Sequence, residues 1–507
     1  MTSIRRHRIP DSLVPQVVRS LLRRPWRIAV VDDQRTWRAY AVLVGAWFAA
    51  SWVGRGSKAK RVGIMLPTSG MFPVALLGVW LARRTPVPLN YLLKPSELEY
   101  VIRDAELDAV ITVRPMLERF GDLPEGVTPL FLEDMPRRGI PRPRFRVRFK
   151  PAETAILLYT SGTSGKPKGV ELTHRGVAAN VIQSRIWGQV TRADVFLGVL
   201  PQFHAFGLTV LTLLPMATGS LAVYTAEFKT ANLRELMRKH HPTGFIGVPA
   251  MYNAFLLDRR ATADDFSSFR FLISGGEPLP PRVKEKFESR FGRTISQGYG
   301  LTETGPVLNW LRPQDHRPES VGKPLPGVDE IIVDEAGRRL PPGQAGEVRV
   351  KGPNVMKGYF KLPEANAKAF DRDGYLKTGD IGMFDEAGNL YLTGRISDLI
   401  IVAGENVYPR EVEEVINGCP GVADSSVTGV PDDARGQVPA AFVELAEDAD
   451  LDETAIRAWC RERLARYKVP RYVVIVEKLP RTATNKVARK ELPLDLVASR
   501  RRGSGDD

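Results

Sequence analysis

The stretch at residues 159–174 holds residue types that are well suited to binding phosphate. An apolar run at 155–159 precedes it and predicts a buried strand. Glycines let a backbone approach a ligand closely, and amides, hydroxyls and lysine donate to anions. We expect a phosphate-binding loop made of Thr160, Ser161, Gly162, Thr163, Ser164, Gly165 and Lys166. It is not a Walker A loop, in which four residues separate the glycines, because only two separate Gly162 from Gly165. The plain alternative is a flexible surface loop.

Five further motifs follow this stretch. They read Tyr-Gly-Leu-Thr-Glu-Thr-Gly at 299–305, Thr-Gly-Asp at 378–380, Gly-Arg-Ile-Ser-Asp at 394–398, Gly-Glu-Asn at 404–406 and Pro-Arg-Thr-Ala-Thr-Asn-Lys at 480–486. With residues 159–169 they resemble the motifs of the adenylate-forming superfamily, which includes acyl-CoA and aryl-CoA synthetases, peptide-synthetase adenylation domains and beetle luciferases. The resemblance covers nearly the whole chain. It implies that a carboxylate attacks the α-phosphate of ATP while pyrophosphate leaves, a step that needs charge neutralisation and positioning.

The resemblance implies a role for each polar motif residue. The loop would hold the β- and γ-phosphates, Thr302 would donate to the α-phosphate, and Glu303 would be the Mg²⁺ carboxylate. Asp380 would accept hydrogen bonds from the ribose hydroxyls, with Arg395 assisting. The expected adenine walls are Gly275, Gly276 and Glu277 on one side and Gln297, Gly298 and Tyr299 on the other. Many relatives have a small residue at the position of Glu277, so we expect backbone to carry much of that wall.

Lys486 is the residue expected to carry the adenylation step. A lysine at the α-phosphate and the attacking carboxylate offsets charge that grows in the transition state. The motif of the family usually has glycine just before this lysine, and Asn485 stands there in this chain. Asparagine tolerates a left-handed backbone better than most residues, so the turn can survive. The basic neighbours Lys478, Arg489 and Lys490 are expected to be solvated.

Three more stretches complete the resemblance. His204 lies in a Pro-x-Phe-His-x-x-Gly sequence that resembles the acyl-pocket gate, where it would position the substrate; the alternative is a structural histidine. Ser397 lies at the hinge of the family, about which the small domain is expected to rotate after adenylation. That rotation would remove Lys486 and let a thiol tunnel for CoA be lined by Gly404, Glu405 and Asn406.

Composition limits the class of protein. The 507 residues suffice for two to four domains, and 43% hydrophobic with 26% charged residues is near the globular average. A net charge of +14 favours anionic partners such as ATP, CoA, anionic lipid or an acidic carrier protein, or else reflects an arginine-rich genome. No nucleic-acid-binding motif is evident. Two cysteines argue against a disulfide framework or a zinc site and suit the cytoplasm.

The arginine-rich start at residues 1–38 has two interpretations. One is a surface helix followed by a strand at 28–31, and the other is a basic amphipathic contact with the inner face of a membrane. The next expected helix, at about 39–52, has almost no polar face. We therefore expect protein, lipid or a partner to cover it. The apolar stretch is short for a membrane span.

Short apolar strands alternate with helices from residue 61 onward, which predicts an α/β fold with a largely parallel sheet. A helix expected at 95–105 carries a capping-box pattern in Ser96 and Glu99. Beyond residue 321, short strands between Gly/Pro/Asp turns predict an antiparallel β subdomain. We expect a large N-terminal domain at 1–395, a small mobile α+β domain with the catalytic lysine at 396–500 and a disordered tail at 501–507.

The combined pattern predicts an ATP-dependent carboxylate–CoA ligase that activates a fatty acid as acyl-AMP and then forms the thioester. A fatty acid is favoured because residues 203–214 and 245–254 contain no formally charged side chain. The first alternative is an acyl-acyl-carrier-protein synthetase, which shares the adenylation step. The second is a catalytically inactive relative that binds or scaffolds.

Overall fold

The computed structural model describes residues 9–136, 139, 141–145, 147–160, 166–315, 317–432, 434–446, 449–481 and 487–497. The chain divides into two compact units. The first comprises Met1–Gly276, Phe287–Glu330 and Val350–Leu376, and the second comprises Glu277–Lys286, Ile331–Arg349 and Lys377–Asp507. The expected boundary after residue 395 stays a prediction, because the second unit contains residues on both sides of it. The expected tail at 501–507 lies outside the described residues.

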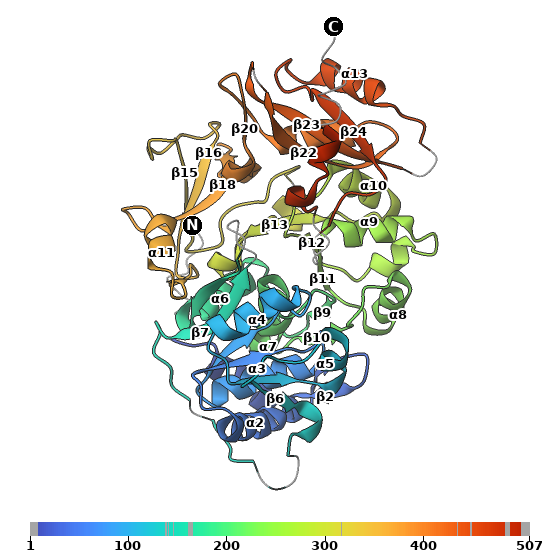
Figure 1. The fold of residues 1–507 in the computed structure, drawn as a ribbon. Helices are drawn as coiled ribbons and strands as arrows, with labels where there is room; N and C mark the ends of the chain where they lie inside the picture. The colour runs from blue at the N-terminus through green and yellow to red at the C-terminus, as the bar shows by residue number, and fades with distance from the viewer. Residues whose placement is uncertain are drawn as a thin grey trace. The chain divides into compact units, whose positions relative to one another are not determined.

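An eight-stranded sheet forms the core of the first unit (Figure 1). Its order is β14 (Val307–Trp310), β13 (Ser296–Gly300), β12 (Phe271–Ser274), β11 (Gly244–Gly247), β9 (Val195–Gly198), β10 (Leu221–Tyr224), β1 (Ile28–Val31) and β2 (Thr36–Arg38). The six inner strands are parallel, and both edge strands are antiparallel. All residues of β11 and β12 are buried, as continuous apolar strands covered on both faces require.

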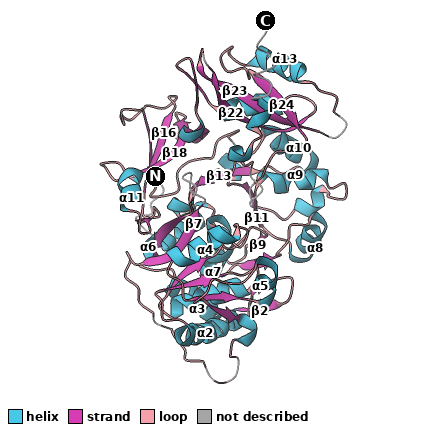
Figure 2. Cartoon of the chain, in the orientation of Figure 1, coloured by secondary structure: helices cyan, strands magenta, loops and turns pink. Residues whose placement is uncertain are grey.

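A second sheet of the first unit is entirely parallel. Its order is β4 (Thr85–Pro88), β3 (Arg61–Ile64), β5 (Ala109–Thr112) and β6 (Thr128–Phe131). The helices of this region are α1 (Val14–Arg23), α2 (Ala39–Gly56), α3 (Met71–Leu81), α4 (Pro95–Asp104) and α5 (Arg114–Phe120). Strands thus alternate with helices along this part of the chain, as predicted (Figure 2).

The apolar helix α2 is covered by protein. It packs closely on α3, since a Cβ added at Gly78 would lie 2.5 Å from the Cβ of Ala49. This contact explains why α2 lacks a polar face. The capping-box prediction for α4 was wrong, because its N-cap is Lys94 and the backbone N–H of Lys94 donates to Glu97. Glu99 instead pairs with Arg103 one turn later.

A third sheet of the first unit contains β7 (Thr154–Thr160), β8 (Lys168–Thr173) and β17 (Gly358–Tyr359). β7 is the buried strand predicted from the apolar run. β7 and β8 pair antiparallel, so residues 168–173 form a strand that the sequence analysis treated as part of the loop. The remaining helices of the unit are α6 (His174–Trp187), α7 (Leu214–Thr218), α8 (Thr230–His240), α9 (Pro249–Leu257) and α11 (Pro363–Ala369), while α10 (Pro281–Phe291) begins in the second unit.

The second unit contains the predicted β subdomain and the α+β domain. The first is a sheet in the order β15 (Asp329–Val333), β16 (Gly346–Lys351), β18 (Leu376–Phe384) and β19 (Leu390–Arg395), of which residues 329–330, 350–351 and 376 belong to the first unit. The second has the order β21 (Glu405–Val407), β20 (Ile400–Val402), β23 (Gly436–Leu445) and β22 (Val422–Asp432), and β24 (Tyr472–Val476) also pairs with β23. Helices α12 (Pro409–Asn417) and α13 (Glu453–Arg463) contribute Val412, Ile416 and Cys460 to its core.

Candidate functional site

The strands β7 and β8 hold both ends of the predicted phosphate loop. Thr160, the last residue of β7, is opposite Lys168 in the ladder, and Lys166 precedes β8. The Nζ atom of Lys166 lies 5.5 Å from the centroid of the Tyr100 ring. The loop residues Ser161, Gly162, Thr163, Ser164 and Gly165 lie outside the described residues. The structure therefore describes the two strands that flank this loop.

Tyr159 ties β7 to helix α4. Its Oη donates to Asp104 Oδ2 at 2.5 Å. Burial, followed by the hydrogen bond and charge of Asp104, raises the pKa of Tyr159 well above its usual value. The phenol consequently stays a neutral donor at all physiological pH values, and it anchors the strand from which the loop begins. Asp104 was not singled out from the sequence.

Glu303 lies in a short 3-10 helix, Thr302–Thr304, and its carboxylate is oriented by a tyrosine. Tyr359 Oη donates to Glu303 Oε1 at 2.9 Å, and the backbone N–H of Met356 donates to the Glu303 carbonyl at 2.7 Å. Burial and the charge of Glu303 raise the pKa of Tyr359. Tyr359 was missed by the sequence analysis, and nothing in its local sequence indicated this contact.

Buried amides fix the backbone after Glu303. Asn354 Nδ2 donates to the Thr304 carbonyl at 2.8 Å, and Asn180 Nδ2 donates to the Val307 carbonyl at 2.7 Å. Asn180 Oδ1 also accepts from the Val307 N–H. Both asparagines are fully buried. Because buried amides are costly unless paired, this arrangement sets the turn firmly. The sequence analysis did not find either asparagine.

The backbone requires glycine at two positions of the 299–305 motif. A Cβ at Gly300 would lie 1.9 Å from the Pro306 carbonyl oxygen, and Gly305 has φ +80°, a left-handed conformation. Thr209 Oγ1 donates to the Gly305 carbonyl at 3.0 Å. The motif is therefore a tight turn, with Thr302 and Glu303 on its first half.

The predicted adenine walls lie on neighbouring parallel strands. Gly275 follows β12, and Gln297, Gly298 and Tyr299 belong to β13, which pairs with β12. The Gly275 N–H donates to Gly247 at 3.1 Å, and a Cβ at Gly275 would lie 2.9 Å from the ring of Phe206.

The glycines of this wall admit a close approach. Gly276 has φ +86°, so its backbone adopts a conformation that other residues rarely take. Glu277 begins the second unit and is described with it. The structure therefore brings five of the six wall residues together.

His204 is exposed in a turn next to this wall, and its neighbours Phe203 and Ala205 are buried. Its N–H donates to the Pro201 carbonyl at 3.1 Å, and its carbonyl accepts from Leu208 at 2.9 Å. A Cβ at Gly207 would lie 2.3 Å from the Pro201 oxygen, so the turn requires glycine. Phe206, two residues after His204, contacts Gly275 and links the two predicted features.

A π-helix, Gly207–Leu213, follows this turn, and every residue in it is buried. Gln202 supports it, since its side chain accepts from the Ser69 N–H at 2.9 Å and donates to Thr212 at 3.0 Å. π-Helical turns are frequent at functional sites. The sequence analysis noted that residues 203–214 carry no charged side chain but did not predict this helix.

Asp380 and Arg395 are neighbours in the second unit. They face each other across β18 and β19, and Arg395 Nε lies 2.9 Å from Asp380 Oδ1. The Asp380 side chain is 7% exposed, whereas that of Arg395 is 53% exposed. Thr378 Oγ1 accepts from the Asp380 N–H at 3.0 Å and donates to Val348 at 2.6 Å. The strand register thus places the two predicted ribose residues together.

The predicted hinge and tunnel residues also lie in the second unit. Ser397 Oγ donates to Asp398 Oδ1 at 2.8 Å. Gly404, Glu405 and Asn406 are exposed at the turn into β21, where Gly404 has φ +89°. Lys486 lies outside the described residues.

Arg489 is not solvated as expected. Its guanidinium forms ion pairs with Asp398 and Glu413. The prediction failed because sequence distance hides these two carboxylates, which lie 91 and 76 residues earlier.

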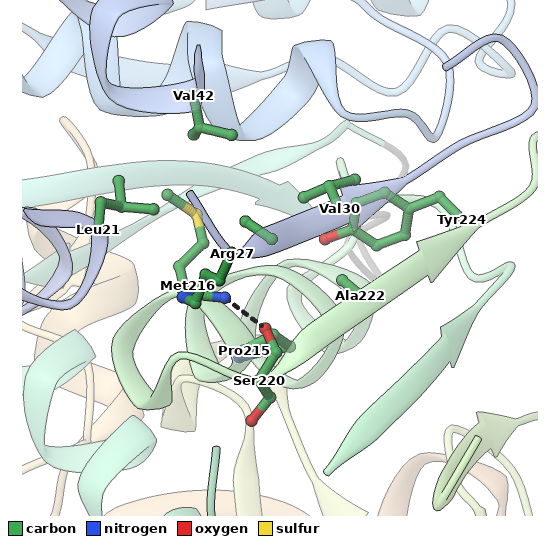
Figure 3. A pocket seen from close by; sticks show the side chains of 10 residues that line it. Leu21, Arg27, Val30, Val42, Pro215, Met216, Ser220, Ala222 and Tyr224 are labelled. Carbon is green, nitrogen blue, oxygen red and sulfur yellow. Dashed lines mark hydrogen bonds between the residues drawn. The ribbon is translucent and has the colours of Figure 1, made fainter. Parts of the chain in front are cut away.

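None of the predicted site residues lines a pocket of the first unit that Figure 3 shows. Its walls include Leu21, Val42, Met216 and Tyr224. Arg27 Nη1 donates to the Ser220 carbonyl at 3.3 Å, while its Nη2 is buried with no acceptor among the described residues. Burial and nearby Arg24 lower the pKa of Arg27. The lining thus combines mainly apolar side chains with Arg27 and the hydroxyl residues Ser220 and Tyr224.

The described residues contain neither a helix that could span a membrane nor a cluster of metal-ligating side chains. No described helix combines the length and apolar character needed to cross a bilayer. No group of three or more His, Cys, Asp or Glu side chains in the described part of the chain could hold a metal ion by itself. Both cysteines, Cys419 and Cys460, are free and buried.

Comparison with known proteins identifies the family. The family model described as AMP-binding enzyme matches residues 18–360, and the model described as AMP-binding enzyme C-terminal domain matches residues 411–486. The long-chain-fatty-acid–CoA ligase of Bacillus subtilis (strain 168) is 34% identical over 481 residues, which cover 86% of this chain and 85% of the relative.

A further relative is named for a different acid, and a solved structure shares the fold. The sulfoacetate–CoA ligase of Cupriavidus necator is 34% identical over 470 residues, which cover 89% of this chain and 90% of the relative. The crystal structure of ATP-bound MatB from Rhodopseudomonas palustris superposes with a TM-score of 0.87 at 30% identity, covering 94% of this chain and 97% of that one. The chain therefore belongs to the AMP-binding, adenylate-forming enzyme family, as an acid–thiol ligase of the AMP-forming class.

Proposed function

We propose that this protein is a fatty acid–CoA ligase. In the first step, a carboxylate oxygen of the acid attacks the α-phosphorus of ATP, and the bond to pyrophosphate breaks. In the second step, the thiolate of CoA attacks the carbonyl carbon of acyl-AMP, and AMP leaves with the electron pair of the broken C–O bond. The protein supplies charge neutralisation and position for the first step.

The described residues fit the proposed nucleotide roles. Thr160 and Lys166 flank the loop proposed to hold the β- and γ-phosphates, and Thr302 stands at the start of the turn proposed for the α-phosphate. Asp380 offers a buried carboxylate to the ribose hydroxyls, and the ion pair with Arg395 orients it. Gly275 and β13 offer backbone and the Tyr299 ring to the adenine.

Glu303 suits a Mg²⁺ ion that arrives with ATP. Mg²⁺ is usually held by one or two carboxylates together with phosphates, rather than by an all-protein cage. Tyr359 already donates to Glu303 Oε1 and so fixes the orientation of the carboxylate. Bound Mg²⁺ would neutralise phosphate charge, and the chain would contribute Glu303 as its ligand.

The observation that carries the fatty-acid assignment is the apolar character of the stretches beside the adenine wall. Residues 203–214 and 245–254 contain no Asp, Glu, Lys or Arg. The π-helix that forms much of the first stretch is buried throughout. An acid with a second anionic group, such as sulfoacetate, would need a cationic partner there. We propose that His204 positions the substrate at the exposed edge of this stretch.

A pyrophosphate-release panel with short, medium, long and aromatic acids and sulfoacetate tests this function. We expect release with ATP, Mg²⁺ and medium or long fatty acids. A preference for sulfoacetate or an aromatic acid would replace the fatty-acid assignment. If folded protein released no pyrophosphate with any acid, the inactive-relative alternative would stand instead.

The acceptor of the second step needs its own test. An acyl carrier protein is the alternative to CoA, because its acidic surface would also suit a basic protein. Preloaded adenylate would be offered to each acceptor separately. Thioester formation on the carrier protein but not on CoA would make the protein an acyl-acyl-carrier-protein synthetase.

We place the reaction in the cytoplasm, with a peripheral contact to the inner face of the membrane.

A further inference from the structure

The Arg489 guanidinium lies between two carboxylates of the second unit. Its Nη1 donates to Asp398 Oδ2 at 2.5 Å. Its Nη2 donates to both oxygens of Glu413, at 2.6 and 2.7 Å. One side chain thus connects three segments that are far apart in the sequence. The compact ammonium of a lysine could not reproduce this planar two-armed geometry, in which one arm is bidentate to Glu413 and the other reaches Asp398.

Each of the three residues belongs to a different structural feature. Asp398 directly follows Ser397, the proposed hinge. Glu413 lies on α12, and its Oε1 also accepts from the Val427 N–H of β22 at 2.8 Å. Arg489 follows Ala488, whose N–H donates to the Pro480 carbonyl at 2.8 Å. Arg489 is therefore attached to the body of the C-terminal α+β domain on two sides.

The two ion pairs differ in exposure. The Glu413 side chain is 14% exposed, and burial raises its pKa although Arg489 opposes that rise. Asp398 is 28% exposed and has a second donor in Ser397. Breaking a buried pair leaves an uncompensated charge, whereas a more exposed pair contributes little to stability. Removing the Asp398 contact should therefore cost the fold less than removing the Glu413 contact.

Other contacts of the second unit span the proposed hinge. Arg410 Nη1 donates to the Leu392 carbonyl at 2.7 Å, and a Cβ at Gly394 would lie 3.4 Å from the Tyr408 ring. These contacts join residues before Ser397 to residues after it. A rotation at Ser397 must break them. It need not break the contact between Asp398 and Arg489, because both residues follow the hinge.

We propose that Arg489 is a positioning residue that holds Asp398 on the C-terminal domain and so confines the rotation to Ile396 and Ser397. This inference depends on the proposed two-step function, because only a domain that rotates between steps needs a defined hinge. The device consists of this chain's own residues and involves no change in the chemistry of either step.

Two variants separate this role from a structural one. Asp398→Asn removes the charge at the hinge, and Arg489→Lys keeps a cation beside Glu413 while losing the second donor arm. Glu411→Gln is the matched control. Glu411 lies on α12 like Glu413, and its loss breaks the ion pair with Lys468 without touching Asp398. Adenylation is measured as pyrophosphate release without CoA, and thiolysis is measured with supplied acyl-AMP.

We expect both hinge variants to change the ratio of thiolysis rate to adenylation rate by about fivefold or more, in the same direction, and the double variant to add nothing further. The control should change this ratio by less than about twofold. An unchanged ratio in Asp398→Asn, or an equal change in Glu411→Gln, would overturn the proposal.

Hydrogen exchange gives a readout that needs no activity. The Leu399 N–H donates to the Ile396 carbonyl at 3.3 Å, so its exchange reports on the hinge. We expect faster exchange in Asp398→Asn and Arg489→Lys than in the control. Equal exchange in all proteins would contradict the proposal. If the wild-type protein released no pyrophosphate, the proposed function would fail, and the exchange measurement alone would then decide whether Arg489 holds the hinge.

Discussion

At the scale of single residues, the motif side chains depend on partners outside the motifs. Glu303 is oriented by Tyr359, and the end of β7 is anchored by the contact of Tyr159 with Asp104. Such partners restrict the geometry of a catalytic group, and their loss typically reduces metal affinity or activity. Substitutions at Lys486 and Tyr359 can therefore separate a residue that acts on the reacting atoms from one that orients another residue.

Replacing Lys486 with alanine should abolish adenylation and leave thiolysis of supplied acyl-AMP largely intact. In the proposed mechanism the ammonium offsets charge that develops when the carboxylate attacks the α-phosphate, and the thiol attack involves no such charge on phosphate. Pyrophosphate release and thioester formation are measured separately on the same preparation. Equal loss of both reactions would show that the role assigned to Lys486 is wrong.

Replacing Tyr359 with phenylalanine should lower the adenylation rate about tenfold at limiting Mg²⁺, because the Glu303 carboxylate loses the donor that orients it. The measurement is pyrophosphate release across a Mg²⁺ titration. Tyr375→Phe is the matched control, since it removes a hydroxyl that donates to Asp329 at 2.6 Å. If both variants showed the same Mg²⁺ dependence, Tyr359 would have no specific link to the metal.

At the scale of elements, the apolar strands and helices of the first unit were predictable because their burial follows from runs such as 155–159. β8 was missed because its glycine and polar residues read as a continuation of the loop; only pairing with β7 makes it a strand. The π-helix could not be foreseen, since its helical type depends on tertiary contacts such as those of Gln202. The ion pairs of Arg489 depend likewise on the folded chain.

The strands β14 and β15 contribute an acid–amide pair whose protonation should affect stability. Asn309 Nδ2 donates to Glu330 Oε2 at 3.0 Å, while Asn309 Oδ1 and Glu330 Oε1 are buried with no partner among the described residues. Burial raises the pKa of Glu330 to about 8. A protonated Glu330 can donate a hydrogen bond, which a carboxylate cannot.

The sign of the pH effect follows from this shift. Between the ordinary pKa of 4.5 and about 8, the folded chain keeps a proton that the unfolded chain has lost. The contribution of Glu330 to stability is thus present below 4.5 and falls as pH rises to about 8. Glu330→Gln should remove this slope and stabilise the protein by about 1–3 kcal/mol at about pH 9. Urea unfolding at several pH values measures the free energy of unfolding of both proteins. If this free energy changed with pH in the same way in the wild type and in Glu330→Gln, the assignment would be contradicted.

At the scale of the whole molecule, part of the net charge of +14 lies on the first unit, where arginines stand beside exposed aromatic side chains. Trp26 is 68% exposed, and its ring centroid lies 5.0 Å from that of Tyr40, which is 41% exposed. Ile28 is 45% exposed and is opposite Arg38 in the strand ladder. Arg38 also donates to the Trp26 carbonyl at 2.6 Å. Aromatic side chains beside arginines suit the headgroup region of an anionic bilayer.

This aromatic–basic patch, Trp26, Ile28, Tyr40 and Arg38 with the neighbouring Arg23 and Arg24, should bind anionic vesicles peripherally. Each arginine near an anionic surface contributes about 1 kcal/mol, so Arg23→Gln with Arg24→Gln should weaken binding by about thirtyfold. Trp26→Ala should weaken it through lost apolar contact. The matched control is Lys239→Gln with Arg259→Gln, which removes two positive charges at exposed sites elsewhere on the unit.

Flotation with phosphatidylglycerol vesicles, and with phosphatidylcholine vesicles for comparison, measures this binding. We expect association with the anionic vesicles that salt weakens, because counterions screen exposed charges. A fatty acid dissolved in the bilayer would then be close to the protein that we propose activates it. No flotation even at low salt, or equal loss in the patch variant and its control, would show that the surface charge serves soluble anions such as ATP and CoA instead.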